Sequence, residues 1–148
     1  MYDDLIELIE RSKVAFPKVG NGVADSTVIR AEESLGISLP ETYRWWLKNY
    51  GGGQIKGDIV YGLDEDNMGR PDIVDLATMN ERDGLYDIKR LVFSIGNGEN
   101  FFFDTTGNSN GEYQVFVHDI TQDEMIPYAE NFAEFLRKRI RELYGIRN

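Results

Sequence analysis

The stretch ESLGISLPETYRWWLKNYGGG, from Glu33 to Gly53, contains the end of one helix, the start of another and an abrupt helix stop. Gly36 suits the position just after the first helix, because glycine adopts the left-handed conformation there without a steric penalty. Pro40 suits the first turn of the second helix, where its missing N–H leaves no bond unmade. The buried stripe of this second helix is predicted to be Tyr43, Trp46, Leu47 and Tyr50. Three consecutive glycines then end it.

The segments at the two ends of the chain also have helical spacing. Asp3 or Asp4 begins a predicted helix that ends at Pro17, and Asp25 begins the helix that leads into the quoted stretch. Residues 128–144 form another predicted helix, in which basic residues near the C-terminal end complement the helix dipole. The chain is therefore expected to have N-terminal helices and a C-terminal helix.

After the glycines the sequence changes to short runs rich in β-branched and aromatic residues. These runs predict strands at residues 58–61, 90–95, 100–104 and 113–118. A tight turn at Asn97 and Gly98 separates the second and third strands, and residues 71–82 have the pattern of a short helix. The fold class predicted from this order is α+β: one domain over residues 1–148, with helices packed against a mostly antiparallel sheet of about four to six strands.

The composition argues against several classes of function. The 148 residues include 16 basic and 26 acidic side chains, and the net charge of −10 disfavours binding to nucleic-acid phosphates. No cysteine is present, which excludes disulfides, thiolate metal sites and a cysteine nucleophile. His118 is the one histidine. We expect it to be structural, because the neighbouring Asp119 would point to the opposite face of a strand.

The first residues argue against export. Four acids among the first ten residues are the opposite of the basic start of a secretory signal. No apolar run approaches the roughly 20 residues that a membrane-spanning helix needs. We therefore expect a cytoplasmic protein that contacts no membrane.

Acidic residues concentrate in two regions of the predicted sheet. Residues 57–88 contain nine acids and two arginines, and residues 97–124 contain six acids and no lysine or arginine. Such regions can attract a basic partner, or can simply be solvated faces. The segment from Asp64 to Asp75 has part of the spacing of a calcium-binding loop, but Met68 stands at an oxygen-ligand position. No metal site is predicted.

Trp45 is the aromatic residue that the predicted core of its helix does not use. It lies about 200° around the helix from Tyr43, and an exposed tryptophan is a common interface anchor. The alternative is a contact with a neighbouring loop or with the final helix.

The quoted stretch resembles the signature of the SUKH superfamily of Smi/Knr-type domains. In that signature a Glu-containing helix is followed by LG, by LP and by a Tyr-containing helix closed by glycines. The matching residues are Leu35, Gly36, Leu39, Pro40, Tyr43, Leu47, Gly52 and Gly53. Later positions also match the family order: Ile95, Gly96, Gly98, Asp104 and Val117. The run PYAENFAEFLRKRI is similar to the closing helix of the family.

This resemblance implies binding rather than catalysis. Members of the superfamily are typically immunity proteins of bacterial polymorphic toxin systems, and others resemble fungal regulators of cell-wall synthesis. The chain is therefore expected to bind and neutralise a cognate toxin, such as a nuclease, as a monomer or weak homodimer and without cofactor. Two alternatives stay open: an intracellular adaptor that binds a housekeeping protein or peptide, and a small-molecule-binding domain or enzyme.

A nuclease must hold a polyanion and is commonly basic near its site, so an acidic and partly aromatic surface would suit it as a binding partner. The residues selected on this ground as partner-binding candidates are Trp45, Asp64, Glu65, Asp66, Asp83, Glu112 and Asp119. No residue is selected as catalytic or as a metal ligand.

Overall fold

The computed structural model describes residues 2–12, 22–64, 72–107 and 110–145. The elements follow in the order α1 (Asp3–Ser12), α2 (Asp25–Leu35), α3 (Glu41–Asn49), β1 (Gly53–Ile55), β2 (Asp58–Val60), α4 (Ile73–Asp83), β3 (Arg90–Ile95), β4 (Glu99–Asp104), β5 (Val115–Asp119), β6 (Glu124–Ala129) and α5 (Phe132–Tyr144). The predicted α+β class, with helices at both ends of the sequence, is confirmed. The predicted helix end at Pro17 lies outside the described residues.

The strands form one antiparallel sheet of six strands in the order β1-β2-β3-β4-β5-β6. Each strand pairs with its neighbours in the sequence, so the predicted meander is confirmed. The four predicted strands correspond to β2, β3, β4 and β5, and the predicted short helix corresponds to α4. The sequence pattern does not predict β1 or β6.

The predicted start of the last helix is wrong. Tyr128 and Ala129 end strand β6, and α5 begins only at Phe132. Asn131 is the cap of α5, because its side chain accepts a hydrogen bond of 2.9 Å from the backbone N–H of Glu134. Tyr128 nevertheless contacts Phe135 of α5. Because the two residues have helical spacing in the sequence, the pattern wrongly places Tyr128 in the helix.

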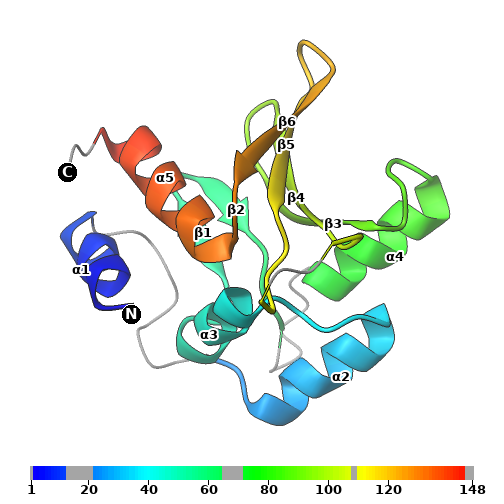
Figure 1. Cartoon of the computed structure of the whole chain (residues 1–148), viewed down its shortest axis with the longest axis horizontal. Helices are drawn as coiled ribbons and strands as arrows, with labels where there is room; N and C mark the ends of the chain where they lie inside the picture. The colour runs from blue at the N-terminus through cyan, green and yellow to red at the C-terminus, as the bar shows by residue number, and fades with distance from the viewer. Residues whose placement is uncertain (1, 13–21, 65–71, 108–109, 146–148) are drawn as a thin grey trace.

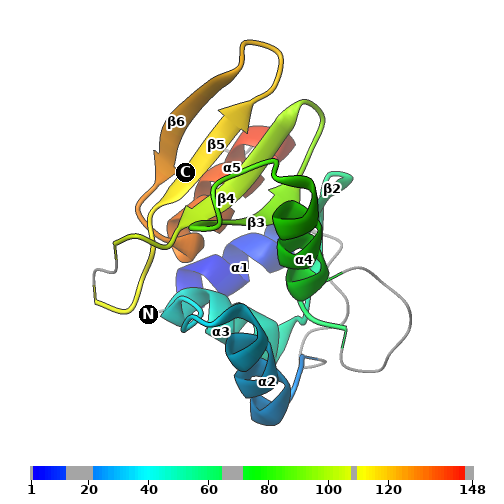
Figure 2. The same ribbon diagram turned by 90° about the vertical axis from the view of Figure 1, so that its right-hand side faces the viewer.

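Helices cover the two faces of the sheet unequally (Figures 1 and 2). α5 packs along one face, and α1 and α3 pack against α5 on the same side. α4 packs on the opposite face, against β3. In Figure 2, α4 lies in front of part of the sheet while β5 and β6 extend beyond it.

The main core lies between the sheet and α5 and is largely aromatic. Phe93 and Phe103 stack with their ring centroids 4.2 Å apart. Phe132 and Phe135 of α5 meet Phe93 edge-on. Tyr43 brings α3 into the same cluster through its contact with Phe103. Edge-to-face and stacked pairs of this kind each add about 0.5–1.5 kcal/mol beyond the burial of their area.

A smaller cluster lies under α4 on the opposite face. It consists of Leu76, Val92 and Phe102, with Tyr86 and Phe116 packed against it. Because helices cover β3 on both faces, residues 91–94 are all buried. This explains why residues 91–93 form a continuous apolar run rather than an alternating one.

The glycines after α3 end that helix as predicted. Gly51 has a φ of +77°, which brings the chain out of α3 and into β1 at Gly53. Tyr43, at the centre of the predicted stripe, is fully buried and donates a hydrogen bond of 2.6 Å to the carbonyl of Tyr61. This bond holds α3 against the end of β2.

Candidate interaction surface

Trp45 is half-buried by an aromatic neighbour from the start of the chain. Its ring stacks on Tyr2 with centroids 4.1 Å apart and an angle of 11° between the planes. Tyr50 meets the same ring edge-on at 6.0 Å. A neighbouring contact is one of the two possibilities expected for Trp45 from the sequence, but the neighbour is Tyr2 and not a loop or the final helix. One face of the indole is covered.

Glu112 joins the connection between β4 and β5 to the start of α3. Its carboxylate accepts hydrogen bonds of 2.9 Å from both the backbone N–H and the hydroxyl of Thr42. The same hydroxyl accepts a hydrogen bond of 3.2 Å from the N–H of Ala133, at the start of α5. Burial raises the pKa of Glu112. Its observed contacts hold two helix ends together.

Removing this carboxylate is expected to destabilise the fold. Glu112→Ala should lower the free energy of unfolding by about 1–2 kcal/mol, because an N–H in the first turn of α3 loses its acceptor. Glu112→Gln keeps a hydrogen-bond acceptor at the same place, so its free energy of unfolding should fall by less than that of Glu112→Ala. Denaturant unfolding curves of the three proteins at neutral pH measure both differences.

The pH dependence of stability supplies a second measurement on the same variants. A carboxyl whose pKa is raised by folding binds its proton more tightly in the folded state, so it contributes stability as the pH falls through the raised pKa toward the ordinary value of 4.5. As the pH is lowered through this range, the free energy of unfolding of wild type should therefore rise relative to that of Glu112→Gln. Parallel pH profiles for the two proteins would contradict this assignment.

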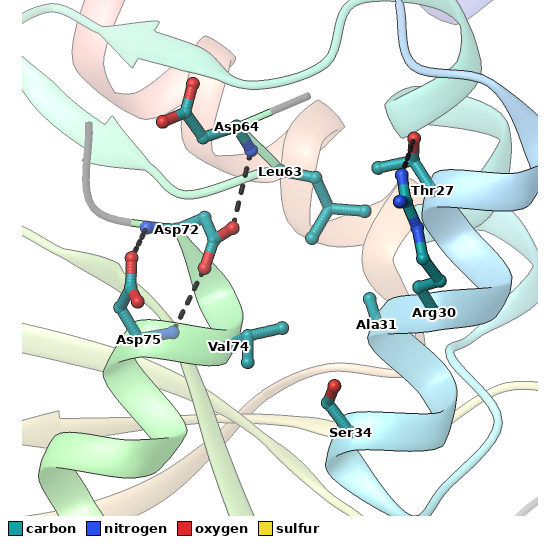
Figure 3. A pocket seen from close by; sticks show the side chains of 9 residues that line it. All are labelled: Thr27, Arg30, Ala31, Ser34, Leu63, Asp64, Asp72, Val74 and Asp75. Atoms are coloured by element: carbon teal, nitrogen blue, oxygen red, sulfur yellow. Dashed lines mark hydrogen bonds between the residues drawn. The ribbon is translucent and has the colours of Figure 1, made fainter. Parts of the chain in front are cut away.

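Asp64 lies at a pocket of about 290 Å³ between α2 and α4 (Figure 3). Its backbone N–H donates a hydrogen bond of 3.4 Å to the carboxylate of Asp72. Asp72 and Asp75 form a capping box at the start of α4, in which each carboxylate accepts a backbone N–H from the other residue at 3.0 Å. Arg30 of α2 stands on the opposite wall.

The Asp72 and Asp75 carboxylates at this pocket cap the start of α4 rather than facing one another. Burial raises the pKa of Asp72, while its hydrogen bonds from backbone N–H groups lower it by a smaller amount. Among the residues that the structure describes, no group of three or more His, Cys, Asp or Glu side chains could hold a metal ion. The arrangement offers a polar recess in which the carboxylate oxygens of Asp72 and Asp75 are directed at the backbone.

Asp83 and Asp119 lie at the ends of other elements. Asp83, at the end of α4, forms an exposed ion pair with Arg82 at 3.0 Å, and this hydrogen bond lowers the pKa of Asp83. Asp119, at the end of β5, accepts a hydrogen bond of 3.2 Å from the N–H of Gln122 in the following turn. Glu65 and Asp66 lie outside the described residues.

The candidates therefore occupy several parts of the fold. Trp45 and Glu112 lie at α3, and Asp64 lies between α2 and α4. Asp83 and Asp119 lie at the end of α4 and at the β5–β6 turn. The structure does not bring these five residues into one cluster.

A hydrogen-bonded network that the sequence analysis does not identify connects α4 with the β5–β6 turn. His118 Nδ1 lies 2.6 Å from the hydroxyl of Tyr86, and His118 Nε2 lies 2.9 Å from the carboxylate of Asp123. Asn100 donates a hydrogen bond of 3.0 Å to the same tyrosine hydroxyl. Asn80 of α4 fixes the backbone of Tyr86 through bonds to its N–H and its carbonyl.

The expectation that His118 does not pair with Asp119 agrees with these contacts, because the histidine pairs with Asp123. The hydrogen bonds are all satisfied when Tyr86 donates to Nδ1 and the imidazole donates from Nε2 to Asp123. The chain of donors then ends on a carboxylate whose side chain is 90% exposed. Finding this network from sequence would require the hairpin register and the path of residues 84–89.

A comparison with protein families identifies the fold at the level of a family. The model of the SMI1 / KNR4 family (SUKH-1) matches residues 22–138, most of the 148-residue chain. The chain belongs to the SMI1 / KNR4 family. The resemblance seen in the stretch from Glu33 to Gly53 is therefore confirmed.

The SUKH-1 match covers α2 to most of α5 and leaves out α1. Tyr2, which covers Trp45, also lies before the matched region. The signature positions Tyr43 and Leu47 are fully buried, so their role in the family pattern is explained by packing. Within residues 2–12, 22–64, 72–107 and 110–145, no helix has both the length and the apolar character needed to cross a bilayer.

Proposed function

We propose that this SUKH-1 protein is a cytoplasmic immunity protein that binds a cognate polymorphic toxin domain and neutralises it by covering its surface. The observation that carries the proposal is membership of the SMI1 / KNR4 family over residues 22–138. The wider superfamily that the sequence resembles typically provides immunity to toxins. In this proposal the protein acts by binding, as a monomer or weak homodimer, and catalyses no reaction.

The charge of the chain favours a basic partner. Its net charge is −10, and between Arg90 and Arg137 the sequence has eight acidic residues and no lysine or arginine. A toxin that cleaves or modifies nucleic acid must hold a polyanion, which requires a basic surface. Opposite charges increase association rates by roughly 10–10³-fold at low salt. A nuclease or other nucleic-acid-targeting toxin is therefore the proposed partner.

The contacts of three carboxylates at helix starts support binding over catalysis. Glu112, Asp72 and Asp75 each accept hydrogen bonds from backbone N–H groups at helix starts. Carboxylates used in this way stabilise helix ends. A general acid or base would instead need to reach a proton of a bound reactant.

Co-expression with the toxin domain encoded by the gene directly upstream tests the proposal. The protein should restore growth to cells that produce this domain, and a purified, catalytically inactivated form of the domain should elute with it as one complex. Because the partner is expected to be basic, the association rate constant should fall by at least about tenfold when salt is raised from about 50 mM to about 500 mM.

The inactivated toxin domain is the control for toxicity, and an unrelated acidic protein of similar size is the control for charge alone. Failure to form a complex together with failure to protect cells would contradict the proposed function. If the complex forms but salt does not change its association rate, the immunity function stands and the proposal of a basic partner is rejected.

A further inference from the structure

The strand register places one residue of each strand side by side in a row across the whole sheet. We name this the cross-sheet row, and its members are Gln54, Ile59, Ile95, Asn100, His118 and Met125. Directly paired residues of antiparallel strands point to the same face. The row shares its face with Phe102 and Phe116, which lie two residues further along β4 and β5 in the direction of the small core under α4.

The apolar members of the row are exposed although they lie within the sheet. Ile59, Ile95 and Met125 are 39%, 38% and 41% exposed. Ile120, two residues beyond His118, is also exposed. α4 packs on this face over the neighbouring positions, and β5 and β6 extend beyond it (Figure 2). Ile59 and Ile95 are direct neighbours, and exposed apolar groups that gather on one face are a common feature of protein interaction sites.

The centre of the row is held rigid before any partner binds. Asn100 and His118 are both fixed by the hydroxyl of Tyr86, whose ring also stacks on Phe102. His118 in turn holds Asp123 at 2.9 Å. A surface whose side chains are already ordered loses less conformational entropy on binding.

The charge around the row selects the kind of partner. Asn100, His118 and Met125 belong to the segment between Arg90 and Arg137, which has no lysine or arginine. Asp119, Asp123 and Glu124 lie next to the row at the β5–β6 turn. Arg90 also reaches the row, with its Nη1 at 2.8 Å from the sulfur of Met125.

We propose that the cross-sheet row is the surface that receives the toxin domain, an inference that rests on the proposed function. The partner contributes an apolar contact to Ile95 and Met125 and a lysine or arginine to the exposed carboxylate of Asp123. The apolar contact supplies most of the affinity, since desolvated central contacts dominate interfaces. The charge supplies mainly the association rate.

Lysine substitutions in the row test this inference against a matched substitution elsewhere. Ile95→Lys on β3 and Met125→Lys on β6 each place a cation in the row, and each should weaken binding of the inactivated upstream-encoded toxin domain at least tenfold. Ile29→Lys makes the same change at a 53% exposed isoleucine of α2 and should change the dissociation constant less than twofold. Titration calorimetry measures all four proteins.

The outcomes separate this inference from the proposed function. If wild type binds and both row variants bind within twofold of it, the row is not the interface while immunity stands. If Ile29→Lys weakens binding as much as the row variants, added positive charge alone explains the effect and the row is again rejected. If wild type does not bind, the proposed function fails. Thermal melting checks that each variant is folded. If Ile95→Lys does not fold, the binding of Met125→Lys alone decides whether the row is the interface.

Discussion

Arg139→Ala is expected to lower the free energy of unfolding by about 3–5 kcal/mol. Arg139 of α5 is 6% exposed, and its Nη2 lies 2.7 Å from the carboxylate of Asp58 and 3.2 Å from that of Glu99. The guanidinium also lies over the ring of Phe101, with its carbon 4.7 Å from the ring centre. It therefore joins α5 to β2 and β4. Without it, two carboxylates share a partly buried site with no cation between them.

Lys138→Ala is the matched control, since it removes a cation at the adjacent position of the same helix. Lys138 is exposed, and it donates to the carbonyl of Tyr128 at 3.1 Å. Its ammonium also lies 4.1 Å from the centre of the Tyr128 ring, and its loss should cost about 1 kcal/mol or less because the site is exposed. Guanidinium chloride unfolding of the three proteins measures the difference. Equal effects of the two substitutions would mean that Arg139 contributes no more than a surface charge.

The sequence predicts the elements in which local pattern and tertiary environment agree. The stripe of α3 and the apolar runs of β3 and β4 are read correctly because they are buried where the pattern says they are. β6 is missed because it is an exposed edge strand that contains Pro127, and proline argues against a strand except at edges, strand starts and bulges. The helix start is misplaced because Tyr128 packs on α5 from a strand.

The contacts at the candidate residues depend on register and on long-range packing. Glu112 and Thr42 are 70 residues apart, and Tyr86 and His118 are 32 apart. Neither pairing has a local signature. The cross-sheet row likewise can be recognised only after five strand pairings are known, because its six members come from six different strands. Charge totals can indicate that a basic partner is favoured, but they do not locate the face.

Gly62→Ala is expected to lower the free energy of unfolding by about 3 kcal/mol. Gly62 follows β2 and is buried against the glycines that end α3. An added Cβ would lie 2.5 Å from the carbonyl carbon of Gly51 and 2.8 Å from the Cα of Gly52, and the carbonyl oxygen of Gly51 is closer still. These atoms are backbone, so no side-chain rotation relieves the overlap. The hydrogen bond of 3.0 Å from Leu63 N–H to Gly51 would have to break.

A melting experiment with a second glycine variant isolates this effect from the general consequences of replacing glycine. Gly107→Ala is the control, because its added Cβ would meet nothing within 4 Å and its φ is not in the left-handed region. It should leave stability unchanged or raise it by up to about 1 kcal/mol. Gly62→Ala should lower the melting temperature by about 6–12 °C, at about 2–4 °C per kcal/mol for a chain of this size. A melting temperature equal to that of Gly107→Ala would show that the segment at Gly62 can move away from the segment at Gly51 at little cost. The close approach of Gly62 to Gly51 would then not be what fixes α3 against the sheet.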